Sequence, residues 1–153
     1  MCVRWTRWRR NRRDGCRPVI EGRCICGGVT VELPRAPEYL NACNCRLCQR
    51  SGGIWGYFPR DEVTIRGETR RFVRSDLDEA YLANLFCPTC GNAAAWIALD
   101  SEYPRMGVNM RLFEPDALRG IETRFPDGLG WAKEAEGPAF VHEPAPYGGG
   151  RIL

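Results

Sequence analysis

The cysteines of this chain are grouped in a way that suits metal binding better than disulfide formation. Of the nine cysteines in 153 residues, seven fall into three clusters. The clusters are Cys24 and Cys26, then Cys43, Cys45 and Cys48, then Cys87 and Cys90. Thiolates so close along the backbone are poorly placed to form disulfides with one another, whereas their sulfurs can share one Zn²⁺ at about 2.3 Å each. The spacing therefore predicts metal chemistry.

The two outer clusters are expected to combine into one site. A structural zinc takes four protein ligands, and a catalytic zinc takes three and keeps one position open. A division into one site of four cysteines and one site of three therefore uses all seven. The later pair lies in a C-P-x-C-G turn, in which backbone amides can point at the sulfurs and Gly91 takes a positive φ. The earlier pair supplies half a site and needs a distant partner. We therefore predict a structural zinc, which closes a long loop, with the ligands Cys24, Cys26, Cys87 and Cys90.

The central cluster offers three sulfurs within six residues. Cys43, Cys45 and Cys48 have no histidine or carboxylate inside their motif to act as a fourth ligand. Three ligands and a vacancy are typical of a reactive metal, so we predict a second, catalytic zinc here. Two alternatives stay open. In the first, all seven cysteines are structural, and a carboxylate or an N-terminal thiol takes the fourth position at the triplet. In the second, the triplet is reduced and holds no metal.

Length and charge favour one domain with tails. Seven arginines against one aspartate give residues 1–17 a charge of +6, so the remainder of a chain with net charge +3 carries −3. A mildly acidic body argues against nucleic-acid binding outside that arm. The arm contains no apolar run long enough for a secretory signal or a membrane span, so we expect a flexible extension and a reducing, cytoplasmic location. Its cysteines, Cys2 and Cys16, receive no role.

Short β-type runs bounded by Gly, Pro, Asp or Asn dominate the rest of the chain, and helix is scarce. The expected strands are 18–26, 29–33, 54–58, 63–65, 71–73, 81–86, 94–99 and 105–110. The expected helical turns are 45–50 and 116–119. We therefore predict a mainly β fold of several small sheets held together by zinc. The predicted organisation is a basic flexible arm over 1–18, a zinc-binding domain over 19–133 and a loosely held Pro/Gly-rich tail over 134–153.

Four motifs, taken in order, resemble one known family. They are C-x-C-G-x-V, C-N-C-x-x-C-x-R-x-G, F-C-P-x-C-G and R-M-G-V-N-M-R-L, and they cover roughly residues 20–131. This pattern resembles the glutathione-dependent formaldehyde-activating enzyme family, which is shared with centromere protein V. The resemblance implies an Mss4-like fold around a structural zinc at the two outer pairs, and a proposed catalytic zinc at the triplet. Many members read C-H-C where this chain has Asn44, a residue that cannot act as an acid or base.

The family name implies addition of the glutathione thiol to formaldehyde, which gives S-hydroxymethylglutathione. A zinc with three thiolate ligands is electron-rich, which favours binding the substrate thiol over polarising the aldehyde. Because glutathione has two carboxylates, the arginines in or near the motifs are the candidates for binding it. They are Arg46, Arg50, Arg105 and Arg111.

The remaining candidates for the site are few. Trp55, Tyr57 and Trp96 are interpreted as core residues of strands, with walling of the site as the alternative. The one histidine, His142, falls in the predicted tail and is expected to be exposed and idle, so the acid or base is left unassigned. The prediction is a zinc-dependent carbon-sulfur lyase acting on thiol adducts of small aldehydes. The alternative is a zinc-stabilised binding module without catalysis.

Overall fold

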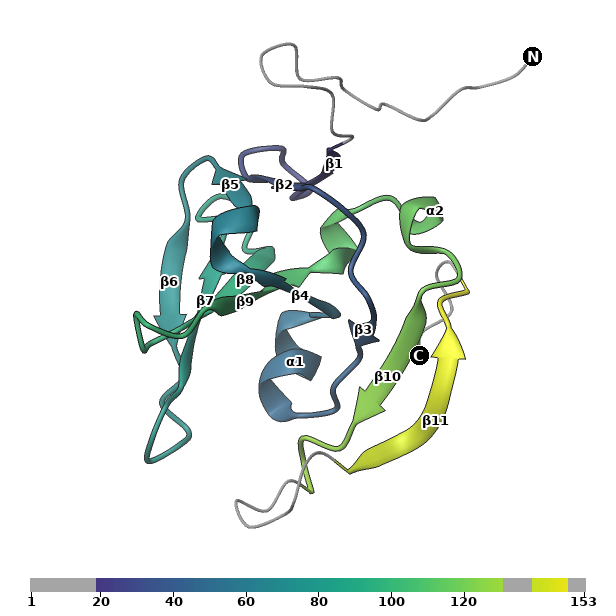
Figure 1. Ribbon diagram of the computed structural model, residues 1–153. Helices are drawn as coiled ribbons and strands as arrows, with labels where there is room; N and C mark the ends of the chain where they lie inside the picture. The colour runs from purple at the N-terminus through teal and green to yellow at the C-terminus, as the bar shows by residue number, and fades with distance from the viewer. Residues whose placement is uncertain (1–18, 131–138, 149–153) are drawn as a thin grey trace, which may run out of the picture.

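The structure of the chain is a computed structural model, which describes residues 19–130 and 139–148. The predicted basic arm, with Cys2 and Cys16, lies outside the described residues, as do parts of the predicted tail. Strands dominate the described part, and the two α-helices are short (Figure 1). The predicted mainly β fold is confirmed.

The elements follow one another along the chain in this order. They are β1 (Ile20–Arg23), β2 (Thr30–Leu33), β3 (Leu40–Asn41), α1 (Arg46–Ser51), β4 (Trp55–Pro59), a 3-10 turn (Arg60–Glu62), β5 (Thr64–Arg66), β6 (Arg70–Val73), β7 (Leu82–Phe86), β8 (Ala93–Ala98), β9 (Arg105–Asn109), a second 3-10 turn (Met110–Leu112), α2 (Pro115–Leu118), β10 (Glu122–Pro126) and β11 (Phe140–Pro146). Each of the eight predicted strands and both predicted helical turns overlaps an observed element.

The strands form two sheets. The smaller sheet is antiparallel, in the order β1-β2-β5, and the larger has the order β11-β10-β3-β4-β9-β8-β7-β6. In the larger sheet only β3 and β10 pair in parallel among the described strands. In β2, Val31 and Leu33 are buried while Thr30 and Glu32 are half-buried, which is the predicted alternation.

The core lies between the two sheets. Its fully buried side chains include Val31, Leu33, Leu40, Phe58 and Val108 from the two sheets and Met110 from the second 3-10 turn. Cys24 and Cys87 belong to the same buried cluster. The thiols of the predicted structural site therefore pack as part of the core, so a metal there would reinforce the contact between the sheets.

The C-terminal segment differs from the sequence-based expectation of a loosely held tail over 134–153. Residues 140–146 form β11, which pairs antiparallel with β10 at one end of the larger sheet (Figure 1). After β11, the Tyr147 side chain is buried in the core, and its N–H donates to the Ile121 carbonyl at 2.8 Å. Every residue of β11 is exposed, so the strand shows no alternation from which it could be predicted.

Because Tyr147 anchors this segment, Tyr147→Ala is expected to lower the free energy of unfolding by about 3 kcal/mol, as for other large buried aromatic side chains. The measurement is denaturant unfolding. Tyr81→Ala is the matched control, since Tyr81 is 61% exposed and Tyr147 is 8% exposed. The control should cost less than about 0.5 kcal/mol. Equal small losses in both variants would contradict the docking of the C-terminal segment.

One face of the larger sheet carries a row of side chains that matters for the site. Register pairs Phe72 with Asn84, Asn84 with Trp96, Trp96 with Gly107, and Gly107 with Tyr57. Residues directly opposite one another project from the same face, so the row crosses five strands from β6 to β4. The Tyr57 and Trp96 rings meet edge to face at 5.8 Å across Gly107. A side chain at Gly107 would collide with the Trp96 indole, so the glycine leaves the space that the indole occupies.

Candidate functional site

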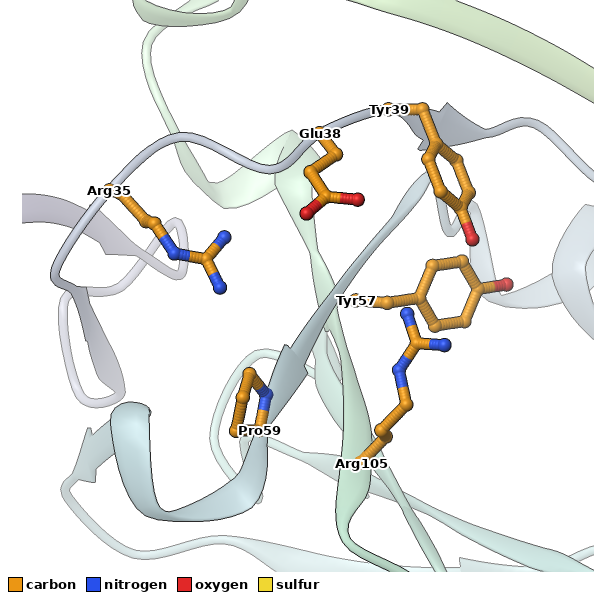
Figure 2. A pocket seen from close by; sticks show the side chains of 6 residues that line it. All are labelled: Arg35, Glu38, Tyr39, Tyr57, Pro59 and Arg105. Atoms are coloured by element: carbon orange, nitrogen blue, oxygen red, sulfur yellow. The ribbon is translucent and has the colours of Figure 1, made fainter.

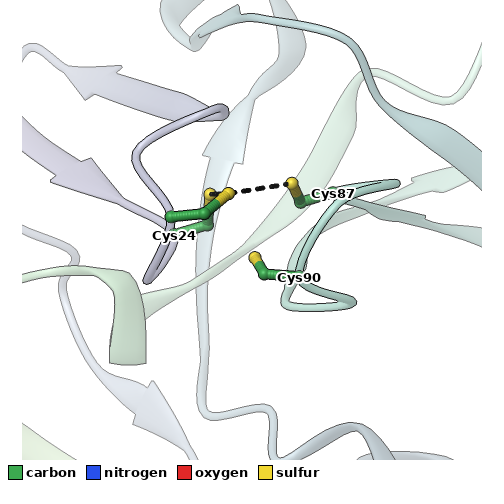
Figure 3. A group of neighbouring side chains, drawn as sticks. Cys24, Cys87 and Cys90 are labelled. Atoms are coloured by element: carbon green, nitrogen blue, oxygen red, sulfur yellow. Dashed lines mark hydrogen bonds between the residues drawn. The ribbon is translucent and has the colours of Figure 1, made fainter.

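The outer cysteine pairs converge as predicted. The sulfurs of Cys24, Cys26, Cys87 and Cys90 all lie within 4.8 Å of one another. Figure 3 shows Cys24, Cys87 and Cys90 of this group, which come from two separate loops. The Sγ atoms of Cys24 and Cys26 are 3.5 Å apart, and those of Cys26 and Cys87 are 3.6 Å apart. Four sulfurs at about 2.3 Å from one zinc would be separated by about 3.8 Å in a tetrahedron. The cluster therefore has the donor set and the spacing of a structural zinc site.

Backbone amides around this cluster favour thiolates. The Asn92 N–H lowers the pKa of Cys90 to about 6, and the Cys90 N–H lowers the pKa of Cys87. On the other side, the Val29 N–H donates to Cys24 Sγ at 3.2 Å. The turn depends on Gly91, which has φ = 74° as the sequence predicted. The later loop therefore favours thiolates, whereas in the earlier loop a backbone N–H lowers the pKa of Cys26 but hydrogen bonds from neighbouring thiols outweigh it and raise that pKa to about 12.

The central triplet lies at the start of α1. Cys45 caps the helix, and its sulfur accepts from the Cys48 N–H at 3.4 Å. A helix places residues three apart on one side, which brings Cys48 back towards Cys45. Cys43 precedes the helix, and its sulfur accepts from the Cys45 N–H at 3.4 Å. The three sulfurs lie within 4.8 Å of one another, and the described residues contribute no fourth histidine, cysteine or carboxylate ligand to this group.

The triplet is arranged to carry negative charge on sulfur. Hydrogen bonds from the Cys43 and Cys48 thiols hold the pKa of Cys45 far below its usual value, to about 2. Hydrogen bonding has the opposite effect on Cys48, because its bonds to Cys43 and Cys45 raise the pKa of the Cys48 thiol. Trp55 Nε1 adds a further hydrogen bond to Cys48 Sγ at 3.2 Å. Three sulfurs with amide and indole donors around them fit a divalent metal with one coordination position left for a guest.

An aromatic side chain of β4 contacts the triplet, and a second one lies on the same face of that strand. Trp55 and Tyr57 alternate along β4 and so share one face, and Trp55 touches Cys48. Tyr57 is half-buried, and burial raises its pKa to about 12 although the Asn41 hydrogen bond lowers it. The Asn41 Nδ2 donates to the Tyr57 hydroxyl at 2.7 Å. Trp55 is 3% exposed, which agrees with its interpretation as a core residue, and its indole N–H also contacts a thiol of the triplet.

A turn after β10 covers the other side of the triplet. Asn44 Nδ2 donates to Asp127 Oδ1 at 2.8 Å, and the Leu129 N–H donates to Asn44 Oδ1 at 3.0 Å. A side chain at Gly128 would lie 2.5 Å from Cys43 Sγ, so the backbone itself packs on the thiol. Asn44 cannot move protons, but its amide uses both a donor and an acceptor to fasten this turn. Nothing in the local sequence pointed to that contact across 83 residues.

Two of the four predicted substrate arginines line a cavity of about 580 Å³ between α1 and the β6–β8 side of the larger sheet. Arg46 and Arg50 come from α1, and Arg74 comes from the end of β6. Asp76 binds Arg74 in a bidentate pair at 2.8 and 2.7 Å and raises its pKa, with a smaller effect from the sulfurs of Cys45 and Cys48. The cavity wall includes Phe72, Asn84 and Phe86, so it combines cationic groups with an apolar surface. The sequence analysis missed Arg74.

Arg105 lines a second cavity, of about 330 Å³, on the same face as Tyr57 (Figure 2). Its guanidinium lies over the Tyr57 ring, 5.5 Å from the centroid, and Arg35, Glu38 and Tyr39 complete the walls together with Pro59. Arg111 lines neither cavity, and its N–H donates to Asn109 Oδ1. The four predicted arginines are therefore not brought together at one place.

His142 is exposed on β11, as expected, and its ring meets Phe125 edge to face at 5.6 Å. None of the helices that the structure describes combines the length and the hydropathy of a membrane span.

Comparisons with known proteins agree with these features. A profile of the family described as "Glutathione-dependent formaldehyde-activating enzyme" matches residues 19–122, which is more than half of the chain. Among solved structures, a crystal structure of a Rhodobacter sphaeroides protein is similar, with a TM-score of 0.51 and 25% sequence identity over 62% of this chain and 88% of that chain. The search of curated proteins found no match. The matched residues contain both cysteine clusters, and the chain therefore belongs to the glutathione-dependent formaldehyde-activating enzyme family.

Proposed function

We propose that the chain is a zinc-dependent carbon-sulfur lyase acting on thiol adducts of small aldehydes, with glutathione and formaldehyde as the prototype pair. The observation that supports this most is the triplet of Cys43, Cys45 and Cys48, whose sulfurs gather without a fourth ligand from the described residues. Structural zinc sites have four protein ligands, and that requirement is met separately by the other four cysteines. One zinc is thus proposed to be structural and the second catalytic.

The reaction adds a thiol to a carbonyl group. A sulfur-carbon bond forms, the π pair of the carbonyl moves to oxygen, and the oxygen gains a proton while the thiol loses one. When zinc is bound at the triplet, it supplies a site that favours the thiolate form of the incoming thiol. The chain's own residues hold that site, because Trp55 contacts Cys48 and the turn around Gly128 packs on Cys43.

The predicted arginines that line the two cavities are proposed to bind the carboxylates of the thiol substrate. Arg46 and Arg50 line the cavity next to the helix that carries Cys48, and Arg105 lines the cavity beside Tyr57. Within the described residues, neither α1 arginine has a carboxylate partner, whereas Arg74 does. Guanidinium groups without an internal partner are available to an anionic ligand. Arg111 is not part of this proposal, since it lines neither cavity.

Arg50→Gln is expected to raise the KM for glutathione about tenfold with little change in kcat, because one charged contact to an exposed carboxylate contributes about 1.4 kcal/mol. Steady-state kinetics of S-hydroxymethylglutathione formation measures this. Arg111→Gln removes the same charge away from both cavities and serves as the control, with an expected change below about twofold. A KM that moves equally in both variants would show only a general charge effect and would count against the cavity.

Zinc stoichiometry with and without glutathione tests the proposed function as a whole. Two zinc ions per chain, one of which exchanges freely, together with heat stabilisation by glutathione, support the enzyme. One inert zinc, no thermal response to glutathione and no turnover of formaldehyde would instead support a zinc-stabilised binding module. The clustered thiols of the described residues are all free, which supports a reducing location such as the cytoplasm.

A further inference from the structure

The proposed reaction needs a group that stabilises negative charge on the carbonyl oxygen, and the sequence did not identify one. The described part of the chain contains a single histidine, exposed on β11, and the carboxylate fastened to Asn44 is unsuited to the task. The Asn44 amide and the Gly130 N–H lower the pKa of Asp127, so this carboxyl group is ionised and can only accept hydrogen bonds. The donor must be a different kind of group.

We infer that the Tyr57 hydroxyl is that group, and that it donates a hydrogen bond to the aldehyde oxygen as the sulfur-carbon bond forms. This inference rests on the proposed function. Its basis is the position of Tyr57 in the fold. Tyr57 shares a face of β4 with Trp55, whose indole N–H touches Cys48 Sγ, so the phenol projects from the side of the sheet on which the triplet lies.

The hydrogen bonding of the phenol leaves its proton available. Asn41 Nδ2 donates to the Tyr57 oxygen at 2.7 Å, which occupies a lone pair, and the described residues provide no acceptor for the phenolic hydrogen. Asn41 itself lies two residues before Cys43, so one short segment of chain positions both the phenol and the first thiol of the triplet. The Tyr57 oxygen is therefore held by a residue of β3, the strand that leads into the metal-binding loop.

The environment keeps this hydroxyl a donor at neutral pH. Burial raises the pKa of Tyr57 to about 12, so the phenol stays protonated. Arg105 lies over its ring and Trp96 packs edge-on against it, which restrains the ring in one orientation. A fixed donor that needs no reorganisation during the reaction is the kind of group that stabilises a developing alkoxide.

The chemical step then balances without any further reactant. The substrate thiol releases its proton to water as it becomes a thiolate, and the thiolate sulfur attacks the aldehyde carbon. The carbonyl π pair moves to oxygen, where the Tyr57 O–H stabilises it by hydrogen bonding. Water returns one proton to that oxygen, which gives the hydroxymethyl thioether and leaves the phenol protonated.

Tyr57→Phe removes the hydroxyl but keeps the ring, and it tests the assignment. We expect kcat for S-hydroxymethylglutathione formation to fall by about 100- to 1000-fold, as when one oxyanion donor is lost from other enzymes, while KM changes little. The matched control is Tyr81→Phe, which removes a hydroxyl from a 61% exposed ring that lines neither cavity and should leave kcat within about twofold. The rates come from exchange NMR, with the uncatalysed reaction subtracted.

Zinc content and the unfolding temperature of both variants must match the parent, so that a change in kcat cannot be structural. A normal kcat in Tyr57→Phe overturns the assignment, and so does a loss of equal size in Tyr81→Phe. If the parent chain itself shows no turnover, the proposed function fails and this inference fails with it. An active parent with an active Tyr57→Phe variant leaves the proposed function standing without this residue.

Discussion

Replacing one ligand of the four-cysteine site, as in Cys87→Ser, is expected to prevent the domain from folding at room temperature. Cys87 is 1% exposed and belongs to the core between the two sheets. Structural zinc sites contribute about 10 to 16 kcal/mol of binding free energy at neutral pH. A whole domain is stable by only about 5 to 15 kcal/mol, so weakening this site removes a share comparable with the total.

The expected readouts are loss of bound structural zinc by metal analysis and loss of the cooperative thermal transition. Thr89→Ser is the control, because Thr89 is exposed in the same turn and its side chain holds no metal. This control should unfold within a few degrees of the parent, at about the effect of an ordinary surface substitution. A Cys87→Ser protein that retains zinc and a parent-like transition would show that the four sulfurs do not form a structural site.

The triplet should behave differently, with activity lost and the fold kept in Cys48→Ser. A metal ion contributes several kcal/mol of stabilisation to a transition state of this kind, and each 1.36 kcal/mol is a factor of ten in rate. We therefore expect kcat/KM to fall by about three orders of magnitude or more. The cost in stability should be about 1 kcal/mol, because the main change outside the metal site is that Trp55 Nε1 donates to a hydroxyl oxygen in place of the larger sulfur.

Activity, zinc content and thermal unfolding of the same sample separate these effects. One zinc per chain should remain, at the outer pairs, and the unfolding temperature should stay close to that of the parent. Gln49→Ala changes an exposed neighbour on the same helix and controls for disturbance of α1. Unfolding of Cys48→Ser would contradict the division into one structural and one catalytic site, and would favour the interpretation that all seven cysteines are structural.

Much of the fold could be predicted because its strands are locally encoded. Alternating residues in β2, and the Gly and Pro residues that bound the strands, mark most of the sheet before any tertiary contact is known. The strands β3, β10 and β11 could not be predicted in this way. A two-residue strand has no pattern, and β11 is exposed along its whole length, so these strands exist only through their pairing partners.

The cysteine sites follow the same distinction. Spacing along the chain was sufficient to propose the ligands of both metal sites, because cysteines two or three residues apart can bind one ion, but only the tertiary structure brings Cys26 to Cys87, 61 residues away. The surroundings of the triplet were not accessible from spacing. Trp55 contacts Cys48 and Asn41 contacts Tyr57 only in the folded chain, and the turn at Gly128 reaches Cys43 from far along the chain.

The arginines show most clearly what could not be predicted from the sequence. Four were candidates by proximity to motifs, but chain proximity does not say which face of a helix or strand a side chain occupies. Arg46 and Arg50 share a cavity since residues four apart lie on one side of α1, whereas Arg74 joins them only because β6 packs beside that helix. Ligand type and metal chemistry are local properties of the chain, whereas the cavity and its charge arise when distant segments pack together.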